Sequence, residues 1–258
     1  MHPQMEKDSI RVIEHQKILL SDAMMLVAFP GTGWAGSVAA YYLIETLKLK
    51  WIASMTSLRF PPIAVIRNGM PMPGIAVYGG PVSCGVDGKY GKLVVITAEF
   101  VPHPSIAGEL SQTIFAWAKK KRIREIIIIE SIASSGEGSD RDIRVIATTR
   151  AKKDIRRLGL ESLDDGLFTG FAGQLSVEAQ LSGFPAITLM VSAREGSPDA
   201  YAAARILEII APLMPALEID PKPLFERARE IEQEMQRKNQ ASRRALSTLS
   251  KEATFMFG

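Results

Sequence analysis

The feature that most limits how this chain can fold is a set of short, uninterrupted apolar runs. A strand with one face in water alternates apolar and polar residues, whereas a strand buried on both faces is apolar throughout. Four runs carry no charged residue: Met24–Phe29, Leu93–Thr97, Ile126–Ile129 and Ala186–Val191. Segments with helical spacing of apolar residues, Ala35–Lys48 and Ser105–Lys121 among them, separate these runs. This order predicts an α/β fold, with a mostly parallel sheet covered by helices on both faces.

The remaining elements are predicted from shorter patterns. Further strands are expected at Ile52–Thr56, Ile63–Ile66, Ile75–Tyr78 and Arg144–Thr148, and further helices at Ala151–Leu158, Gly173–Leu181 and from Asp199 to about Leu213. The turn Met72-Pro73-Gly74 predicts that Ile63–Ile66 and Ile75–Tyr78 pair as a hairpin. Ser105 and Asp199 are expected to cap the helices that follow them.

Reactive side chains are scarce in this chain of 258 residues. Its three histidines (His2, His15 and His103) and one cysteine, Cys84, are too few for a structural zinc site of the usual kind. A single cysteine also excludes an internal disulfide. The N-terminal residues are polar, and no apolar run approaches the roughly 20 residues that span a membrane. We therefore expect a cytoplasmic protein with no bound metal or cofactor.

The composition changes toward the C-terminus and predicts three parts. Four prolines between Pro212 and Pro223 mark a boundary. We place an α/β core at residues 1–220, a charged amphipathic helix at 221–246 and a flexible tail at 247–258. The helix carries one apolar stripe: Leu224, Ala228, Ile231 and Met235. The tail ends in Phe255-Met256-Phe257-Gly258. This apolar end could fold back onto the body or a neighbouring subunit, or it could dock on a partner.

A glycine-rich segment follows the first apolar run. Gly31-Thr32-Gly33-Trp34-Ala35-Gly36 fits the G-x-G-x-x-G pattern between a strand and a helix, where the backbone can approach a pyrophosphate. The pattern also requires an acidic residue after the next strand, and Ile52–Thr56 ends without one. Gly31, Gly33 and Gly36 are therefore a possible ligand loop. The alternative is that they allow a tight turn and close packing of helix on sheet.

Parallel strands place ligands at their carboxyl ends. Four loops leave such ends: Pro30–Gly36, Ala98–Pro104, Ser131–Asp142 and Ser192–Asp199. They supply the polar candidates Glu99, His103, Ser134, Ser135, Glu137, Asp140, Glu195 and Asp199. His103 could act as a general base, but a histidine in a rigid surface loop is the favoured interpretation. Glu137 could contact a ligand, and a solvated connection explains it equally well. Neither a nucleophile elbow nor a Walker loop, zinc spacing or paired-carboxylate motif is present, so we predict no catalytic residues.

Several motifs in a fixed order resemble one known family. Phe29-Pro30-Gly31-Thr32-Gly33-Trp34-Ala35-Gly36-Ser37, followed by Tyr41-Tyr42-Leu43-Ile44, resembles the opening signature of the archaeal proteasome assembly chaperones. Later segments agree in order: Arg59-Phe60-Pro61-Pro62, Trp117-Ala118, Thr169-Gly170-Phe171-Ala172-Gly173 and Ser197-Pro198-Asp199-Ala200. The resemblance implies a three-layer α/β/α domain of the phosphorylase/nucleosidase-like kind that forms a homo-oligomer. It also implies a chaperone that helps to build the 20S proteasome, or binds its α-ring, without ATP.

The resemblance gives the C-terminal tail a function. Proteasome activators end in a hydrophobic residue, a tyrosine and any residue, and Met256-Phe257-Gly258 is similar to this pattern. Phe255, Met256, Phe257 and Gly258 are then the partner-binding residues, with the terminal carboxylate paired to a lysine of the α-ring. The sequence therefore predicts a non-enzymatic proteasome-binding protein. The alternative is an enzyme that binds a nucleotide or another small molecule through Gly31–Gly36.

Overall fold

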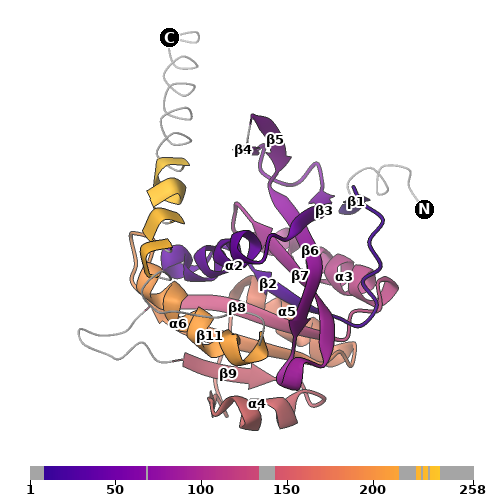
Figure 1. The fold of residues 1–258 in the computed structure, drawn as a ribbon, viewed down its shortest axis with the longest axis vertical. Coiled ribbons are helices and arrows are strands. Elements are labelled where there is room, and N and C mark those ends of the chain that lie inside the picture. Colours follow the sequence, from indigo (N-terminus) through magenta and orange to yellow (C-terminus); the bar gives the residue numbers. More distant parts are fainter. Residues whose placement is uncertain are drawn as a thin grey trace.

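The computed structural model describes residues 9–67, 69–133, 143–214, 225–227, 229–231 and 233–238. Within these ranges the main sheet has nine strands (Figure 1). In spatial order they are β1 (Arg11–Glu14), β3 (Lys50–Thr56), β6 (Ile75–Cys84), β7 (Tyr90–Ala98), β2 (Ala23–Ala28), β8 (Glu125–Ala133), β11 (Ala186–Ala193), β9 (Ile143–Ala147) and β10 (Glu161–Ser162). The four charge-free apolar runs form the centre of this sheet.

The centre of the sheet is parallel and most of its flanking pairs are antiparallel. Strands β7, β2, β8 and β11 are neighbours that run in one direction. On one side β6, β3 and β1 are added in antiparallel fashion, and on the other side β9 is antiparallel to β11. The predicted parallel sheet is thus confirmed for the strands buried on both faces. The antiparallel strands lie outside them, and β3, β6 and β7 are connected without an intervening α-helix.

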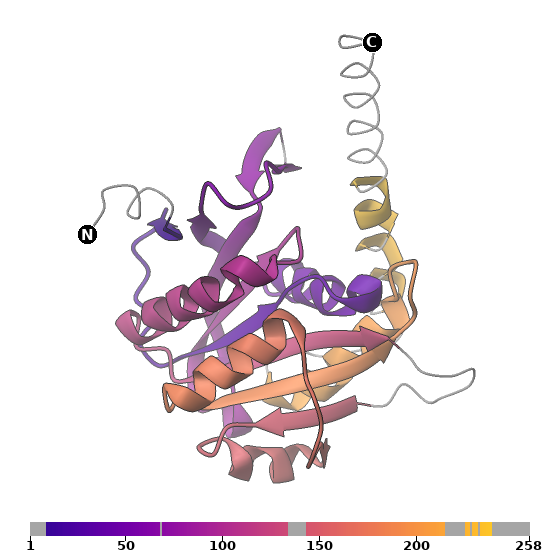
Figure 2. The ribbon, with the colours of Figure 1, turned by 180° about the vertical axis from the view of Figure 1, so that it is seen from behind.

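Continuous apolar runs are explained by the helices on both faces of the sheet. Ile127 and Ile129 of β8 lie in one core, together with α2 (Ala35–Thr46) and α6 (Ala200–Ile210). Ile126 and Ile128 lie in a second core on the opposite face, together with α3 (Pro104–Lys120) and α5 (Gly170–Leu181). Figures 1 and 2 show these two helix pairs on opposite sides of the sheet. The predicted three-layer α/β/α architecture is confirmed.

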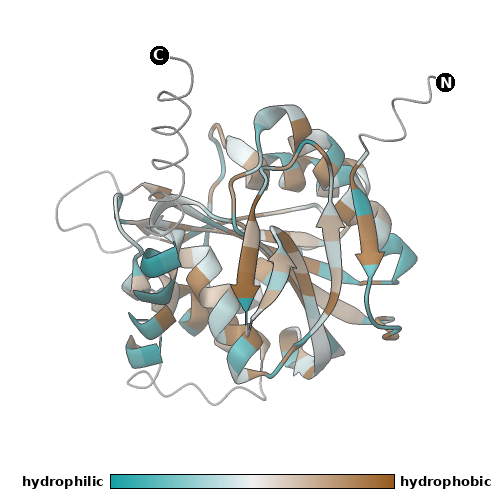
Figure 3. Ribbon diagram, turned by 90° about the horizontal axis from the view of Figure 1, so that it is seen from above, coloured by the Kyte–Doolittle hydropathy of each residue, from teal (hydrophilic) through white to brown (hydrophobic). Residues whose placement is uncertain are grey.

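Polarity follows the same layering. In Figure 3 the strands of the sheet carry mostly white and brown residues, and the most hydrophilic colours lie on outer helices and turns. None of the helices in the described ranges is both long and apolar enough to cross a lipid bilayer.

The predicted hairpin is wrong in its pairing. Ile75–Tyr78 belongs to β6, which lies in the main sheet between β3 and β7. The strand that pairs with β4 (Ala64–Arg67) is β5 (Met70–Pro73), which overlaps the predicted turn Met72-Pro73-Gly74. The prolines in β5 concealed it, because proline is normally excluded from central strands and is tolerated only at edges. The β4–β5 hairpin projects from the body of the protein (Figures 1 and 2).

Of the two N-caps predicted from the sequence, the structure confirms one. Asp199 caps α6, since its carboxylate accepts a hydrogen bond from the Ala202 amide at 3.1 Å. Ser105 does not cap α3. The N-cap is His103, whose Nδ1 accepts from the Ser105 amide at 3.3 Å, and Pro104 occupies the first helical turn. Proline suits this position because the first-turn amide has no partner within the helix.

The described residues of the predicted C-terminal helix are helical and lie against the body. Ile231 is buried in the core beside α2 and α6, and Phe225 and Met235 pack at its margin. The Arg227 guanidinium forms an ion pair with Glu45 at the end of α2. Leu224 and Ala228 of the predicted stripe, and the tail at 247–258, lie outside the described residues. The shorter helix α4 (Lys152–Leu158) lies near β9 and ends at Gly159, as predicted.

Candidate functional site

Three of the four loops predicted at the carboxyl ends of parallel strands lie at one edge of the sheet: Pro30–Gly36, Ala98–Pro104 and Ser192–Asp199. They follow β2, β7 and β11, which run in one direction together with β8. Of the fourth predicted loop, Ser131–Ala133 belong to β8 and residues 134–142 lie outside the described residues. Helices α2, α3 and α6 begin from the three described loops, so their N-termini also lie at this edge. We call this region the carboxyl edge.

Gly33 and Gly36 are explained by contacts within the chain. Gly33 has a φ of +59°, and its carbonyl accepts a hydrogen bond from the Asp199 amide at 2.7 Å. A Cβ at Gly33 would lie 2.7 Å from the Arg194 carbonyl oxygen. A Cβ at Gly36 would lie 3.1 Å from Ile129 Cγ2, so this glycine brings α2 close to the sheet. Both residues hold the first loop against its neighbours.

Gly31 makes room for a carboxylate that the sequence analysis did not select. A Cβ at Gly31 would overlap Glu130 Oε1 and would lie 2.9 Å from the Ser131 carbonyl oxygen. Glu130 ends the isoleucine run of β8, and its carboxylate accepts a hydrogen bond from the Ser131 amide at 3.1 Å. Burial raises the pKa of Glu130 to about 7. The sequence did contain a signal for this residue: an acidic residue that directly follows a fully apolar strand is expected near the carboxyl edge. It is also expected to be partly buried there, which raises the pKa of a carboxyl group.

Glu130 makes the stability of the protein depend on pH. The pKa of this carboxyl is raised on folding from 4.5 to about 7, so the folded state binds the extra proton between these values. Stability therefore falls as the pH rises through this range, by roughly 3 kcal/mol in total. We expect Glu130→Gln to remove this fall, measured by urea unfolding at pH 5 and pH 8. Glu195→Gln, at an exposed acid of a neighbouring loop, is the control. An unchanged pH dependence in Glu130→Gln would contradict the assignment.

A small cleft opens at the carboxyl edge between the glycine loop and the C-terminal helix. Its volume is about 190 Å³, and its walls include Trp34, Glu99, Phe100, Met235 and Lys238. Trp34 has a φ of +49°, which lies in the left-handed region that residues other than glycine seldom adopt. The cleft thus joins two predicted loops to the segment that leads into the C-terminal tail.

Glu99 connects three elements beneath this cleft. Its carboxylate accepts a hydrogen bond from the Tyr41 hydroxyl of α2 and lies 3.4 Å from the Arg67 guanidinium of β4. Arg67 also lies over the Tyr41 ring, 4.4 Å from its centroid. Burial, with the Glu99 charge as a smaller cause, raises the pKa of Tyr41 well above its ordinary value. Glu99 was predicted as a ligand-binding candidate, and the structure places it as the anchor of the β4–β5 hairpin.

The other predicted polar residues do not converge on the cleft. His103 is exposed and caps α3, while Asp199 is buried and caps α6. Glu195 is exposed, and Ser134, Ser135, Glu137 and Asp140 lie outside the described residues. Among the residues that the structure describes, no group of three or more His, Cys, Asp or Glu side chains could hold a metal ion. The described polar groups at this edge mainly hold its loops and helices in place.

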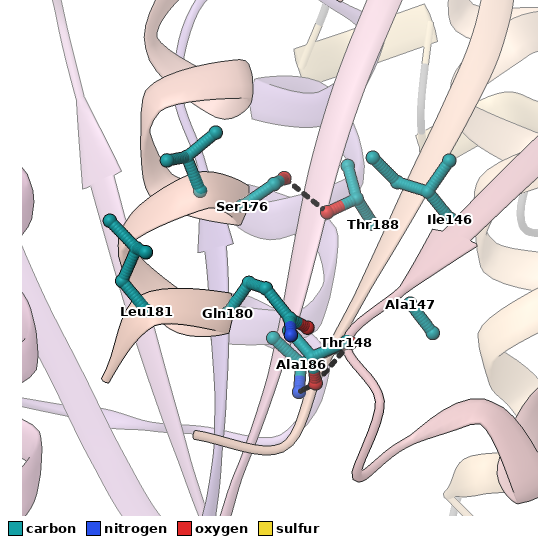
Figure 4. A pocket seen from close by; sticks show the side chains of 9 residues that line it. Ile146, Ala147, Thr148, Ser176, Gln180, Leu181, Ala186 and Thr188 are labelled. Carbon is teal, nitrogen blue, oxygen red and sulfur yellow. Dashed lines mark hydrogen bonds between the residues drawn. The ribbon is translucent and has the colours of Figure 1, made fainter. Parts of the chain in front are cut away.

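A second hollow, which no sequence pattern indicated, lies on the other helix layer between α5, β9 and β11. It has a volume of about 280 Å³ and its walls include Ile146, Val177 and Leu181 (Figure 4). Its hydroxyl groups already have partners within the chain. Ser176 Oγ lies 2.7 Å from Thr188 Oγ1, and Thr148 Oγ1 accepts from the Ala186 amide at 3.0 Å. The groove therefore presents mainly aliphatic surface.

Solved structures of similar fold include two from Pyrococcus furiosus. PbaA, described as an archaeal homolog of proteasome-assembly chaperone, has a TM-score of 0.75 and 22% identity, covering 97% of this chain and all of PbaA. PbaB, described as an archaeal proteasome activator, has a TM-score of 0.72 and 22% identity, covering 90% of this chain and 99% of PbaB. These likenesses confirm the fold.

Sequence comparison agrees with the motifs identified above. An uncharacterized protein of Methanocaldococcus jannaschii is 23% identical over 228 residues, covering 88% of this chain and 90% of that protein. The model of the PAC2 family matches residues 25–238, which include the glycine loop, most of β2, the other three central strands and the described part of the C-terminal helix. On this match, the chain belongs to the PAC2 family.

Proposed function

We propose that this protein is a non-enzymatic, homo-oligomeric proteasome assembly chaperone or activator-like protein of the cytoplasm. The proposal further states that it binds 20S α-subunits through Phe255, Met256, Phe257 and Gly258. The observation that carries it is membership of the PAC2 family together with a fold shared over nearly the whole chain with PbaA and PbaB. Those two proteins are described by their connection to the proteasome.

The carboxyl edge supports a role in binding rather than in chemistry. Glu99, His103 and Asp199 each hold a structural element in place, and Glu130 lies against Gly31. A phosphate at the glycine loop would meet this carboxylate, whose negative charge would repel it at neutral pH and above. For this reason we do not extend the proposal to nucleotide binding or to dependence on ATP.

The chemistry of the tail suits a pocket between subunits. The Gly258 carboxylate would pair with a lysine, and the Phe257 ring would pack beside the aliphatic stem of that lysine. Phe257 lacks the hydroxyl of the tyrosine in the activator pattern, so each tail binds with one hydrogen bond fewer. Several tails on one oligomer compensate through avidity.

Removal of residues 255–258 tests the proposal. We expect the shortened protein to bind 20S particles about tenfold more weakly or worse, measured by interferometry and native mass spectrometry. Deletion of four residues within 247–254, which leaves the C-terminus intact, is the matched control and is expected to retain binding. Phe257→Tyr is expected to bind about 2- to 12-fold more tightly, since one hydrogen bond contributes roughly 0.5–1.5 kcal/mol. Equal binding by the full-length and shortened chains would show that the tail has no such role.

A further inference from the structure

The β4–β5 hairpin is apolar on both of its faces. Val65 and Met72 form one cross-strand pair, and both are buried against the body. Ile66 pairs with Pro71 on the opposite face, where the Ile66 side chain is 61% exposed. A two-stranded ribbon is only marginally stable in water by itself. An isoleucine that faces solvent does not stabilise such a ribbon, and exposed apolar surface often marks a binding site. The outward face is therefore a candidate contact surface.

The hairpin is held in place by a charged anchor. Arg67, the last residue of β4, reaches the Glu99 carboxylate and the Tyr41 ring. These contacts join the hairpin to β7 and α2, so its orientation is set before any partner arrives. Such preorganisation lowers the entropy that is lost on binding.

The edge of the hairpin favours docking through side chains rather than addition of a strand. Pro71 and Pro73 lie in β5, and proline has no amide hydrogen to offer a new strand. Within a ladder, proline is accommodated where its nitrogen faces away from the neighbouring strand. The free edge of β5 is therefore poor in donors, and the face that carries Ile66 is the feature left for contact.

The hairpin lies next to the segment that leads to the C-terminus. Glu99, which binds Arg67, shares the carboxyl-edge cleft with Met235 and Lys238. Hydrogen bonding from Lys238 lowers the pKa of Glu234, and the charge of Arg67 adds to this effect, so the hairpin anchor and the helix share one electrostatic environment. Twenty residues follow Lys238 and end in Phe255-Met256-Phe257-Gly258. A protein that takes this end is brought to the side of the molecule where the hairpin projects.

We propose that the outward face of the β4–β5 hairpin is a second contact surface for the folded protein that receives the C-terminal segment. It meets an apolar patch on that partner, with Ile66 as the exposed side chain that enters it and the exposed Pro71 beside it on the same face. The inference rests on the proposed function for the identity of the partner. The tail provides the tether and the hairpin fixes the orientation of the docked body.

The test compares full-length variants for binding to 20S particles. Ile66→Glu is expected to weaken binding about tenfold, because it places a charge at the centre of the outward face. Leu181→Glu, at an exposed leucine of α5 on the opposite helix layer, is the matched control and is expected to bind normally. Circular dichroism and the subunit number from native mass spectrometry are measured for every variant.

The possible outcomes separate this inference from the proposed function. If binding depends on residues 255–258 while folded Ile66→Glu binds normally, the hairpin surface is refuted and the tail role stands. If Ile66→Glu changes the subunit number, the surface joins copies of this chain and the inference is also refuted. If the full-length protein does not bind 20S particles, the proposed function itself fails.

Discussion

Gly33→Ala is expected to destabilise the protein by about 2–5 kcal/mol. An L-residue in the left-handed region costs roughly 1–2 kcal/mol, and overpacking in a closed site adds about 1–3 kcal/mol. Both costs apply here, because Gly33 has a φ of +59° and a Cβ would lie 2.7 Å from the Arg194 carbonyl oxygen. The two loops cannot easily move apart to make room for the Cβ, because the Gly33 carbonyl accepts a hydrogen bond from the Asp199 amide. Urea unfolding followed by circular dichroism measures the loss.

Gly108→Ala is the matched control for this substitution. Gly108 lies within α3, and no atom lies within 4 Å of the position that its Cβ would take. Alanine is favoured over glycine inside a helix, so this variant is expected to gain about 0.5–1 kcal/mol. If Gly33→Ala retained the stability of the parent protein, the contact between the two loops would be less constrained than the geometry indicates.

Asp199→Ala is expected to cost about 2–4 kcal/mol. The Asp199 carboxylate is fully buried and accepts hydrogen bonds from the Ala202 amide at 3.1 Å and from the Arg194 amide at 3.0 Å. Loss of a helix cap costs roughly 1 kcal/mol, and an amide left without an acceptor costs about 1–3 kcal/mol more. The measurement is again the free energy of unfolding, with the thermal midpoint as a second readout.

Asp199→Asn provides the comparison, because it keeps one oxygen for the Ala202 amide and is expected to lose about 1 kcal/mol. The Asp199 and Gly33 positions are also in contact through the backbone, so their effects are not expected to add. A double variant as unstable as the sum of the two single ones would indicate that the two loops act independently.

The layered fold could be predicted because a strand that is buried on both faces appears in the sequence as a continuous apolar run. Ile126–Ile129 must face apolar surface on each side of the sheet, and the structure provides one helix pair for each. The antiparallel flank was harder to predict. In β6, Gly79, Gly80 and Pro81 interrupt the pattern of a strand that is ten residues long. The strand is nevertheless stable there because it pairs with β3 and β7 on both sides.

The location of the site could also be predicted, but not which groups its residues contact or how deeply they are buried. Strand direction alone was enough to predict that the loops after β2, β7 and β11 lie at one edge. Whether Glu99 meets a ligand or an arginine of the same chain depends on the position of β4, which local sequence does not determine. Glu130 was missed for a related reason, since its burial is produced by the approach of Gly31 from a distant part of the chain.

The packing of the C-terminal helix has a consequence for symmetry. Ile231 is buried in the core and Arg227 is paired with Glu45, so the point where the chain departs toward its end is fixed relative to α2. In a ring of identical copies, these departure points would form a regular polygon whose side length is set by the cores. The C-terminal ends would then be evenly spaced and would suit a target with evenly spaced binding sites. If the number of binding sites differed from the number of copies, fewer C-terminal ends could bind at once. In such a ring, the packing of Ile231 would therefore link the number of copies to the number of C-terminal ends that can bind at once.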